Sequence, residues 1–300
     1  MSGGYASRLS EYRNKGVCGL PEHFETRRTL ANKMNKLLQL VKESDKIVVL
    51  TGAGISTAAG ISDFRGPNGV WTREMNGDNH GRKRQRTSDE GDGKTASALS
   101  TQEPVKSEPF QCLEPTYTHH ALQRLLKANY IQYIVTQNVD GLHLRSGVPR
   151  SNLSILHGDC FLEKCENCGK EYFRDYDIAG LSFKRTGRFC DNSGALDTSI
   201  PSCAGALRDT ILDWEDELPE PDFGRAEDIC DSADLVIALG TSLRIVPAGK
   251  LPLRAKKYAI INLQQTPYDQ DANVVIHHYT DTVMQYLLTN LDIGGNDIKI

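Results

Sequence analysis

The stretch VVLTGAGISTAAGISDFRGPNGVWT, residues 48–72, decides the fold class because an apolar strand runs directly into a loop that contains two glycines. Gly52 and Gly54 follow the strand, which is where the parallel sheets of α/β proteins bind phosphates. Glycine tolerates a positive φ and lets backbone N–H groups approach an anion without a Cβ in the way. Alone, this pattern fits a nucleotide-binding loop and an ordinary tight turn equally well.

The same loop departs from G-x-G-x-x-G, the fingerprint of the dehydrogenases. Thr57 stands where the third glycine would fall, and no acidic residue closes a nearby second strand. Both features count against a protein that exchanges hydride with a dinucleotide. Ser56 and Thr57 could instead cap the following helix or contact a phosphate or ribose, and the loop continues into Asp63, Phe64 and Arg65.

The rest of the chain alternates between helical and strand patterns. Apolar residues at helical spacing predict helices over residues 27–43, 118–130 and 280–291. Short apolar runs predict strands over residues 46–50, 131–136, 234–240, 258–263 and 273–277. Strands of this kind between helices indicate an α/β protein with an open, parallel, Rossmann-like sheet covered on both faces.

Two segments interrupt this pattern. Residues 74–111 are polar, lack apolar periodicity and predict a disordered loop insertion. Residues 161–209 hold paired cysteines and little continuous apolar sequence, so we expect a small separate module there. The Rossmann-like domain is then discontinuous, over residues 22–160 and 210–292, after an N-terminal extension of residues 1–21.

Composition excludes several classes of protein. The chain has 300 residues and a formal net charge of −4, so any nucleic-acid contact would have to be local. No apolar run approaches the roughly 20 residues of a membrane span, and the first residues lack the apolar core of a secretory signal. We therefore expect a soluble intracellular protein that does not bind a membrane.

The cysteines suggest a metal site. Cys165 and Cys168 form a CxxC pair, and Cys190 and Cys203 follow with twelve residues between them. Four thiolates suit tetrahedral zinc, and a closed four-cysteine shell is structural because it leaves no position open for water. A CxxC pair alone could equally be redox-active. The other cysteines are interpreted as free thiols or core residues: Cys18, Cys112, Cys160 and Cys230.

Further motifs resemble the sirtuin family. GAGIS followed by GISDFRG matches its signature, with Ser62 in place of a proline. TQNVDGLHLRSG (136–147), HGD (157–159), GTSL (240–243) and INLQ (261–264) are similar to sirtuin motifs and occur in the family order. The segments GYASRLSEYRNKGVCGLPEHF, FRGPNGVWT and RDTILDWEDELP are most similar to the nuclear, class IV branch that contains sirtuin six.

This resemblance implies a protein that cleaves NAD at the nicotinamide bond instead of reducing it. The acyl oxygen of a modified lysine attacks the ribose carbon, and free lysine and O-acyl-ADP-ribose are finally released. His157 corresponds to the family's general base, a role that suits imidazole because it titrates near neutral pH. Asn138 and Asp140 correspond to its other catalytic residues.

The resemblance also implies the cofactor contacts. The NAD-binding residues would be Gly52, Ala53, Gly54, Thr57, Asp63, Phe64, Arg65, Trp71, Gln137, His157, Gly240, Ser242, Asn262, Gln264 and Thr280. Asp63 would bind the nicotinamide amide. Without the resemblance, Phe64 and Trp71 would be interpreted as core aromatics and Arg65 as a surface charge. The family places a structural zinc ion in the region of Cys165, Cys168, Cys190 and Cys203.

The implied substrates are acylated lysine side chains of histones and other chromatin proteins, in the nucleus. The basic cluster GRKRQR (81–86) fits a nuclear import signal, a nucleic-acid contact or a solvated run of charge. Two other functions stay open: protein mono-ADP-ribosylation, and a non-catalytic NAD-sensing chromatin scaffold. His157, Asn138 and Asp140 argue against the scaffold, because a binding module needs no general base.

Overall fold

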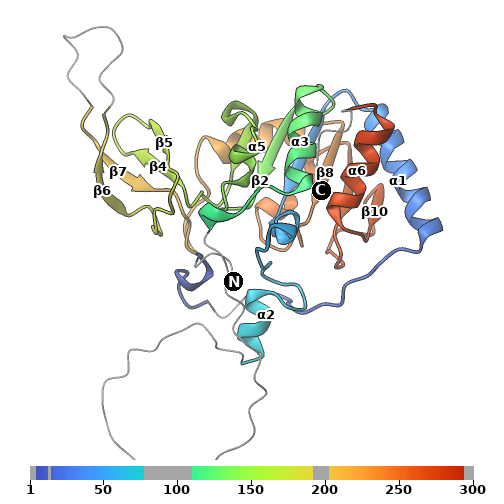
Figure 1. The fold of residues 1–300 in the computed structure, drawn as a ribbon, viewed down its shortest axis with the longest axis horizontal. Coiled ribbons are helices and arrows are strands. Elements are labelled where there is room, and N and C mark those ends of the chain that lie inside the picture. Colours follow the sequence, from blue (N-terminus) through green and yellow to red (C-terminus); the bar gives the residue numbers. More distant parts are fainter. Residues whose placement is uncertain (1–4, 13–14, 78–109, 192–202, 294–300) are drawn as a thin grey trace, which may run out of the picture.

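The computed structural model describes residues 5–12, 15–77, 110–191 and 203–293. Its larger part is a six-stranded parallel sheet flanked by helices (Figure 1). The strand order is β10-β9-β8-β1-β2-β3. The strands are β1 (Ile47–Thr51), β2 (Tyr133–Thr136), β3 (Leu153–Ile155), β8 (Leu235–Leu239), β9 (Lys257–Ile261) and β10 (Val274–Ile276). The predicted α/β class and parallel sheet are confirmed.

Helices cover both faces of this sheet. On one face lie α1 (Arg27–Lys42), α3 (Tyr117–Lys127) and α6 (Thr280–Asn290), and on the other α5 (Asp222–Asp231) and the 3₁₀ helix η6 (Ala248–Arg254). In β1, Ile47 and Val49 pack toward the first layer, whereas Val48 and Leu50 pack toward the second. Because alternate side chains enter different cores, the strand is apolar from Ile47 to Leu50.

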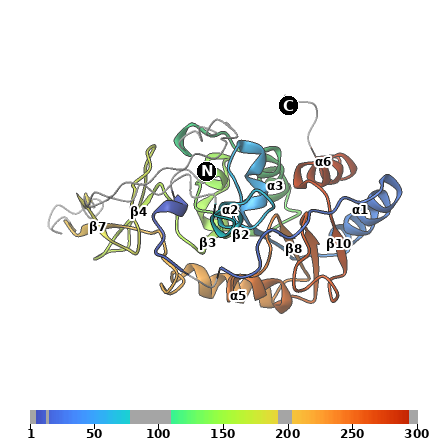
Figure 2. The same cartoon turned by 90° about the horizontal axis from the view of Figure 1, so that it is seen from below.

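A second, smaller sheet is inserted between β3 and α5. It is antiparallel, with the order β5-β4-β7-β6. Its strands are β4 (Leu162–Cys165), β5 (Glu171–Phe173), β6 (Arg185–Phe189) and β7 (Ala206–Asp209). The small sheet projects from one end of the α/β domain (Figures 1 and 2). Arg150 joins the two parts, because its Nη2 donates to Glu171 of β5 at 2.9 Å and to Asp222 of α5 at 2.7 Å.

Short elements complete the described chain. They are α2 (Val70–Met75), α4 (Leu142–Arg145) and the 3₁₀ turns η1 (Tyr5–Ser7), η2 (Ala53–Ile55), η3 (Thr57–Ala59), η4 (Phe110–Cys112) and η5 (Arg150–Asn152). Side chains from η1, α2 and η4 form a third apolar cluster with Phe161 and Ile211, beside the loops that follow the strands. No helix in the described ranges has the length and apolar character needed to cross a bilayer.

The predicted helices and strands are all present, with shifted ends. The helix predicted to reach residue 130 ends at Lys127, because Asn129 adopts a left-handed conformation with φ +61°. The predicted loop over residues 74–111 is too long at both ends. Residues 74–75 belong to α2, and Phe110 is buried in the third cluster, which anchors the end of that segment. Residues 78–109, including the basic cluster 81–86, lie outside the described residues.

Candidate active site

A cavity of about 530 Å³ opens at the carboxyl ends of the parallel strands. From β1 the sheet continues through β2 and β3 on one side and through β8, β9 and β10 on the other, so the strand order reverses between β1 and β8. Such a topological switch point is where open α/β sheets bind ligands. Segments that follow β1, β2, β3, β8 and β9 all contribute to the cavity wall.

Most of the predicted site residues line this cavity. They are Gly52, Ala53, Gly54, Asp63, Phe64, Arg65, Trp71, Gln137, Asn138, Asp140, His157, Gly240, Ser242, Asn262 and Gln264. Thr57 and Thr280 do not. Thr57 is exposed and its hydroxyl donates to the Gly54 carbonyl at 3.1 Å. Thr280 is buried between α3 and α6, where its hydroxyl accepts from Thr118 at 3.0 Å.

The two glycines after β1 serve close packing. A Cβ on Gly54 would lie 2.7 Å from Gly240 Cα, and one on Gly52 would lie 2.7 Å from Thr241 Cβ. The Gly52 N–H donates to the Leu239 carbonyl, and the Gly54 N–H donates to the Gly240 carbonyl. Contrary to the expectation from the sequence, neither amide is free to donate to a phosphate. The glycines therefore bring the loops after β1 and β8 into contact, and Gly240 itself has φ +59°.

His157 lies at the cavity wall as a neutral imidazole. Its Nδ1 is 3.0 Å from the Gln137 carbonyl, and since a carbonyl only accepts, Nδ1 carries the proton. Burial lowers the pKa of His157 to about 4, and the nearby Arg65 cation lowers it as well. Nε2 is thus unprotonated at neutral pH and can accept a proton from a ligand hydroxyl.

Gly158 determines how the chain leaves His157. It has φ +82°, and a Cβ there would lie 1.9 Å from the Thr210 carbonyl oxygen. Only glycine fits this position, because both the conformation and the backbone contact exclude a side chain. The Leu212 N–H also donates to the His157 carbonyl at 3.3 Å. The segment that leaves β7 therefore packs directly against the histidine loop.

Asn138 and Asp140 are joined through a buried serine. Ser56 donates to Asp140 Oδ2 at 2.7 Å and accepts from Asn138 Nδ2 at 3.3 Å. Burial raises the pKa of Asp140, although the bonds from Ser56 and from the Leu142 N–H oppose the shift. The expectation that Ser56 caps the following helix is wrong, because its side chain makes no capping bond and is fully buried.

Arg65 forms a cationic corner of the cavity. Its guanidinium lies 4.4 Å from the centroid of the Trp71 ring, and its Nε and Nη2 donate to the Lys15 carbonyl at 3.2 and 3.0 Å. Burial lowers its pKa to about 10, which still leaves it charged at neutral pH. Burial also raises the pKa of Asp63, whose Oδ1 accepts from the Gly66 N–H at 3.0 Å.

Several lining residues were not predicted. Apolar ones are Tyr5, Leu9, Ile61, Phe110, Val139, Leu212 and Trp214, and acidic ones are Asp213, Asp216, Glu217 and Glu220. Tyr12 stacks on Trp214 with ring centroids 4.7 Å apart, and Trp214 Nε1 donates to the Ser10 carbonyl at 3.1 Å. The segment RDTILDWEDELP (208–219) could have identified five of them, because it places aromatic and acidic residues together after the cysteine module. The others lie outside that segment and have no comparable signal.

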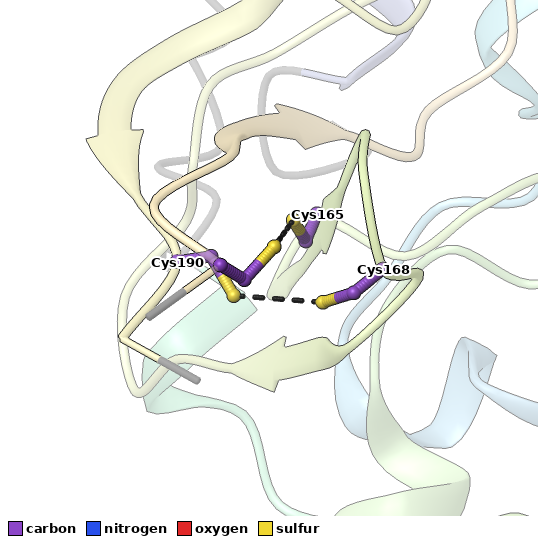
Figure 3. Close-up of side chains that lie close together, drawn as sticks. Cys165, Cys168 and Cys190 are labelled. Carbon is purple, nitrogen blue, oxygen red and sulfur yellow. Dashed lines mark hydrogen bonds between the residues drawn. The ribbon is translucent and has the colours of Figure 1, made fainter. Parts of the chain in front are cut away.

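The four predicted cysteines converge at one point of the small sheet, and Figure 3 labels three of them. The Sγ atoms of Cys165 and Cys203 are 3.6 Å apart, as are those of Cys168 and Cys190, and all four lie within 4.8 Å of one another. Disulfide sulfurs would be about 2 Å apart. Four sulfurs each about 2.3 Å from one zinc ion would be roughly 3.8 Å apart, so the cluster fits a structural zinc ion.

The neighbour of the histidine loop, Asp159, gives a prediction about stability. Burial raises its pKa to about 7, and the Asp140 carboxylate raises it as well. Folding therefore favours the neutral form, so this group makes the protein less stable as pH rises from about 4 to about 7. Asp159→Asn keeps the oxygen that accepts from Phe161 N–H at 2.8 Å.

We expect Asp159→Asn to raise the free energy of unfolding at pH 8 by on the order of 2–4 kcal/mol, and by less at pH 5. Urea unfolding of both proteins at the two pH values checks this. An equal change at pH 5 and pH 8 would contradict it, because the gain must grow as the wild-type carboxyl ionises.

The fold and site together define an α/β protein with a ligand cavity at its switch point and an inserted metal-binding module. Residues 52–247 match the model of the Sir2 family, and the chain belongs to that family. The predicted sirtuin resemblance is therefore confirmed.

Relatives and solved structures agree with this assignment. The chain is 42% identical over 297 residues to the Arabidopsis thaliana protein named NAD-dependent protein deacetylase SRT1, covering 98% of this chain and 56% of the relative. It is 41% identical to the Drosophila melanogaster NAD-dependent protein deacetylase Sirt6, covering 95% of this chain and 83% of the relative. The chain thus spans about half the length of its plant relatives. A solved complex titled Sir2-p53 peptide-NAD+ superposes with a TM-score of 0.59 at 26% identity, covering 87% of this chain and all of that one.

Proposed function

We propose that this protein is an NAD-dependent protein-lysine deacylase that acts on histones in the nucleus. The observation that carries the proposal is His157, a neutral imidazole whose Nδ1 is tied to the Gln137 carbonyl and which shares one cavity with Asn138. The Arabidopsis and Drosophila relatives bear the name NAD-dependent protein deacetylase, which supports the proposal. The products would be nicotinamide, free lysine and O-acyl-ADP-ribose.

In this reaction the chain's own residues have separate tasks. Nε2 of His157 takes the proton of a ribose hydroxyl, while the Gln137 carbonyl keeps the ring in the required tautomer. Asn138, held by the Ser56–Asp140 pair, presents its amide to the sugar. Arg65 supplies positive charge for the diphosphate. Because an amide oxygen is a weak nucleophile, orientation by these residues must supply much of the rate acceleration.

The acidic wall supports histones as substrates. Asp213, Asp216, Glu217 and Glu220 line the cavity and belong to the short segment between β7 and α5. A cavity edge with several carboxylates attracts peptides whose neighbouring residues are lysine and arginine. Histone tails have this composition, whereas an acidic peptide would be repelled. The nuclear location is proposed together with this substrate, and the similarity to Sirt6 supports it.

The apolar side of the cavity supports acyl groups longer than acetyl. Tyr5, Leu9, Ile61, Phe110 and Val139 line this side, and all five belong to the third apolar cluster. An acetyl group leaves most of such a surface without a partner. A fatty acyl chain would bury it, and each buried methylene contributes roughly 0.8 kcal/mol.

The experiment combines NAD with histone peptides that carry acetyl-lysine or myristoyl-lysine. It follows nicotinamide release, peptide mass and ADP-ribose attached to protein, with His157→Ala as the control. Loss of the acyl mass together with nicotinamide release supports the proposal, and faster loss of myristoyl supports the long-chain preference. ADP-ribose on protein without loss of the acyl group would favour the transferase alternative. Binding of NAD without any nicotinamide release would favour a scaffold.

A further inference from the structure

The loop after β2, which carries Asn138 and Asp140, is held by buried hydrogen bonds at both ends. At its start, the Asn138 N–H donates to Thr136 Oγ1 at 3.1 Å. In its middle, the Asn138 side chain donates to Ser56, which donates to Asp140. At its end, the Leu142 N–H donates to Asp140 Oδ1 at 3.0 Å. These bonds determine where the Asn138 amide lies in the cavity.

His143, the next residue, closes these bonds into a ring. Its Nε2 is 2.9 Å from Thr51 Oγ1, and the Thr51 hydroxyl donates to Thr136 Oγ1 at 2.9 Å. Thr51 and Thr136 are paired residues at the ends of β1 and β2. The path therefore runs from His143 through the Thr51 hydroxyl to the Thr136 hydroxyl, which accepts from the Asn138 N–H. His143 does not line the cavity, so it acts on a ligand only through this path.

The direction of the bonds requires one tautomer of His143. The Thr51 hydroxyl donates to Thr136 Oγ1 at 2.9 Å, and its other acceptor is the Val135 carbonyl at 3.5 Å. Because the Thr51 proton is used in this direction, the Thr51 oxygen must accept from His143, and Nε2 of His143 must donate. His143 is buried, and burial lowers its pKa to about 3. Its Nδ1 has no hydrogen-bond partner among the described residues, so a second N–H would be buried without an acceptor. His143 is thus a fixed neutral donor.

We propose that His143 is a positioning residue for catalysis: its Nε2–H, through the Thr51 and Thr136 hydroxyls, holds the Asn138 backbone so that the Asn138 amide meets the nicotinamide ribose. This inference rests on the proposed NAD cleavage. It predicts that His143 acts before the nicotinamide bond breaks, whereas His157 acts on the ribose hydroxyl afterwards.

The two histidines should therefore affect different steps. His143→Leu removes the donor while filling a similar volume, and a displacement of about 1 Å at Asn138 would lower the rate on the order of 10²-fold. We expect both the exchange of labelled nicotinamide into NAD and deacylation to fall by this factor, with a KM for the acyl peptide close to that of the wild type. His157→Ala should instead retain exchange and lose deacylation.

The test measures both rates for the wild type, His143→Leu, His143→Gln and Thr51→Val with an acetyl-lysine peptide. His143→Gln keeps an N–H donor and should recover most of the exchange. Thr51→Val interrupts the path and should resemble His143→Leu, and the double variant should be no slower than either single variant. Ser154→Ala is the matched control. Its hydroxyl is equally buried but contacts Tyr133 and Asp222 outside the ring, so it should lower stability and leave exchange within about twofold.

The inference would be overturned if His143→Leu and Thr51→Val fold and exchange nicotinamide at the wild-type rate. It would also be overturned if His143→Gln exchanges nicotinamide as slowly as His143→Leu. If His143→Leu does not fold, Thr51→Val and His143→Gln decide the question by the same criteria. A wild-type protein that exchanges no nicotinamide would overturn the proposed function itself, which keeps the two failures apart.

Discussion

Replacing His157 by alanine is expected to lower kcat/KM for deacylation by about 10²–10⁴-fold, the usual contribution of a positioned general base. The geometry supports this size of effect. The ring is at the cavity wall, its tautomer is set by the Gln137 carbonyl, and Gly158 and Thr210 allow the loop one conformation. Initial rates of nicotinamide release and of peptide deacylation, measured separately, check the prediction.

The pH profile tests the same residue independently. Burial lowers the pKa of His157 to about 4, so the imidazole of the free enzyme is a competent base throughout the neutral range. Because His157 stays unprotonated above about pH 5, its ionisation should leave kcat/KM constant there, and kcat/KM should fall as the pH drops through 4. A solvated histidine would lose activity already below about pH 6.5. An acidic limb centred near 6.5 would therefore show that His157 is not buried in the working enzyme.

A matched control for His157→Ala is His120→Ala. His120 is a partly buried histidine of α3 that does not line the cavity. We expect its replacement to leave kcat/KM within a factor of about two. Equal losses in the two variants would show that the effect of His157→Ala comes from general destabilisation.

Removing the metal is expected to unfold the small sheet and abolish activity. Structural zinc contributes about 10–16 kcal/mol of binding free energy in isolated zinc-finger peptides, and that energy is available only to the folded module. The core of the small sheet consists of Leu207 and the cysteines themselves, with Tyr172 at its edge, so few apolar contacts remain without the ion. We expect activity to depend on this module because Leu212 and Trp214, which follow β7 closely in the chain, line the cavity.

The measurement combines a strong chelator with thermal unfolding, metal analysis and the deacylation assay. We expect one equivalent of zinc per chain, and a Tm lower by roughly 10 °C or more after its removal, since each kcal/mol shifts Tm by a few degrees in a domain of this size. Cys168→Ser should reproduce the loss. Cys112→Ser, at an exposed cysteine outside the cluster, should not. A metal-free protein with unchanged Tm and activity would refute a structural role for the ion.

Much of this architecture could be predicted from the sequence because long apolar patterns decide it. α1 and α6 are amphipathic over at least three turns, and the strands β1, β8 and β9 are buried on both faces, so each is recognisable alone. β3 and α5 were missed for a physical reason. β3 has three residues, and α5, with the sequence DFGRAEDICD, buries little more than Ala226 and Cys230. Their stability comes from tertiary contacts that no local pattern reports.

The candidate site was predictable where a residue type is unusual in its place, and not where packing decides. The four cysteines stand out in the sequence, and the structure brings them together. His157 is one of eight histidines, and only the resemblance of its HGD motif to the sirtuin family singles it out. Ser56 does not stand out, because its role depends on Asn138 and Asp140, which come from a different loop. Likewise, the close approach of Gly54 to Gly240 joins positions far apart in the chain. Such pairings exist only once the sheet has formed.

The turn η1 has a practical consequence for anyone who prepares the protein. Tyr5 and Leu9 are part of the cavity wall, and Arg8 forms an ion pair with Asp177 that fastens this turn. A shortened protein that lacks the residues up to Leu9 would lose part of the cavity wall together with this ion pair. Ligand affinities measured on such a protein would therefore not represent the intact cavity.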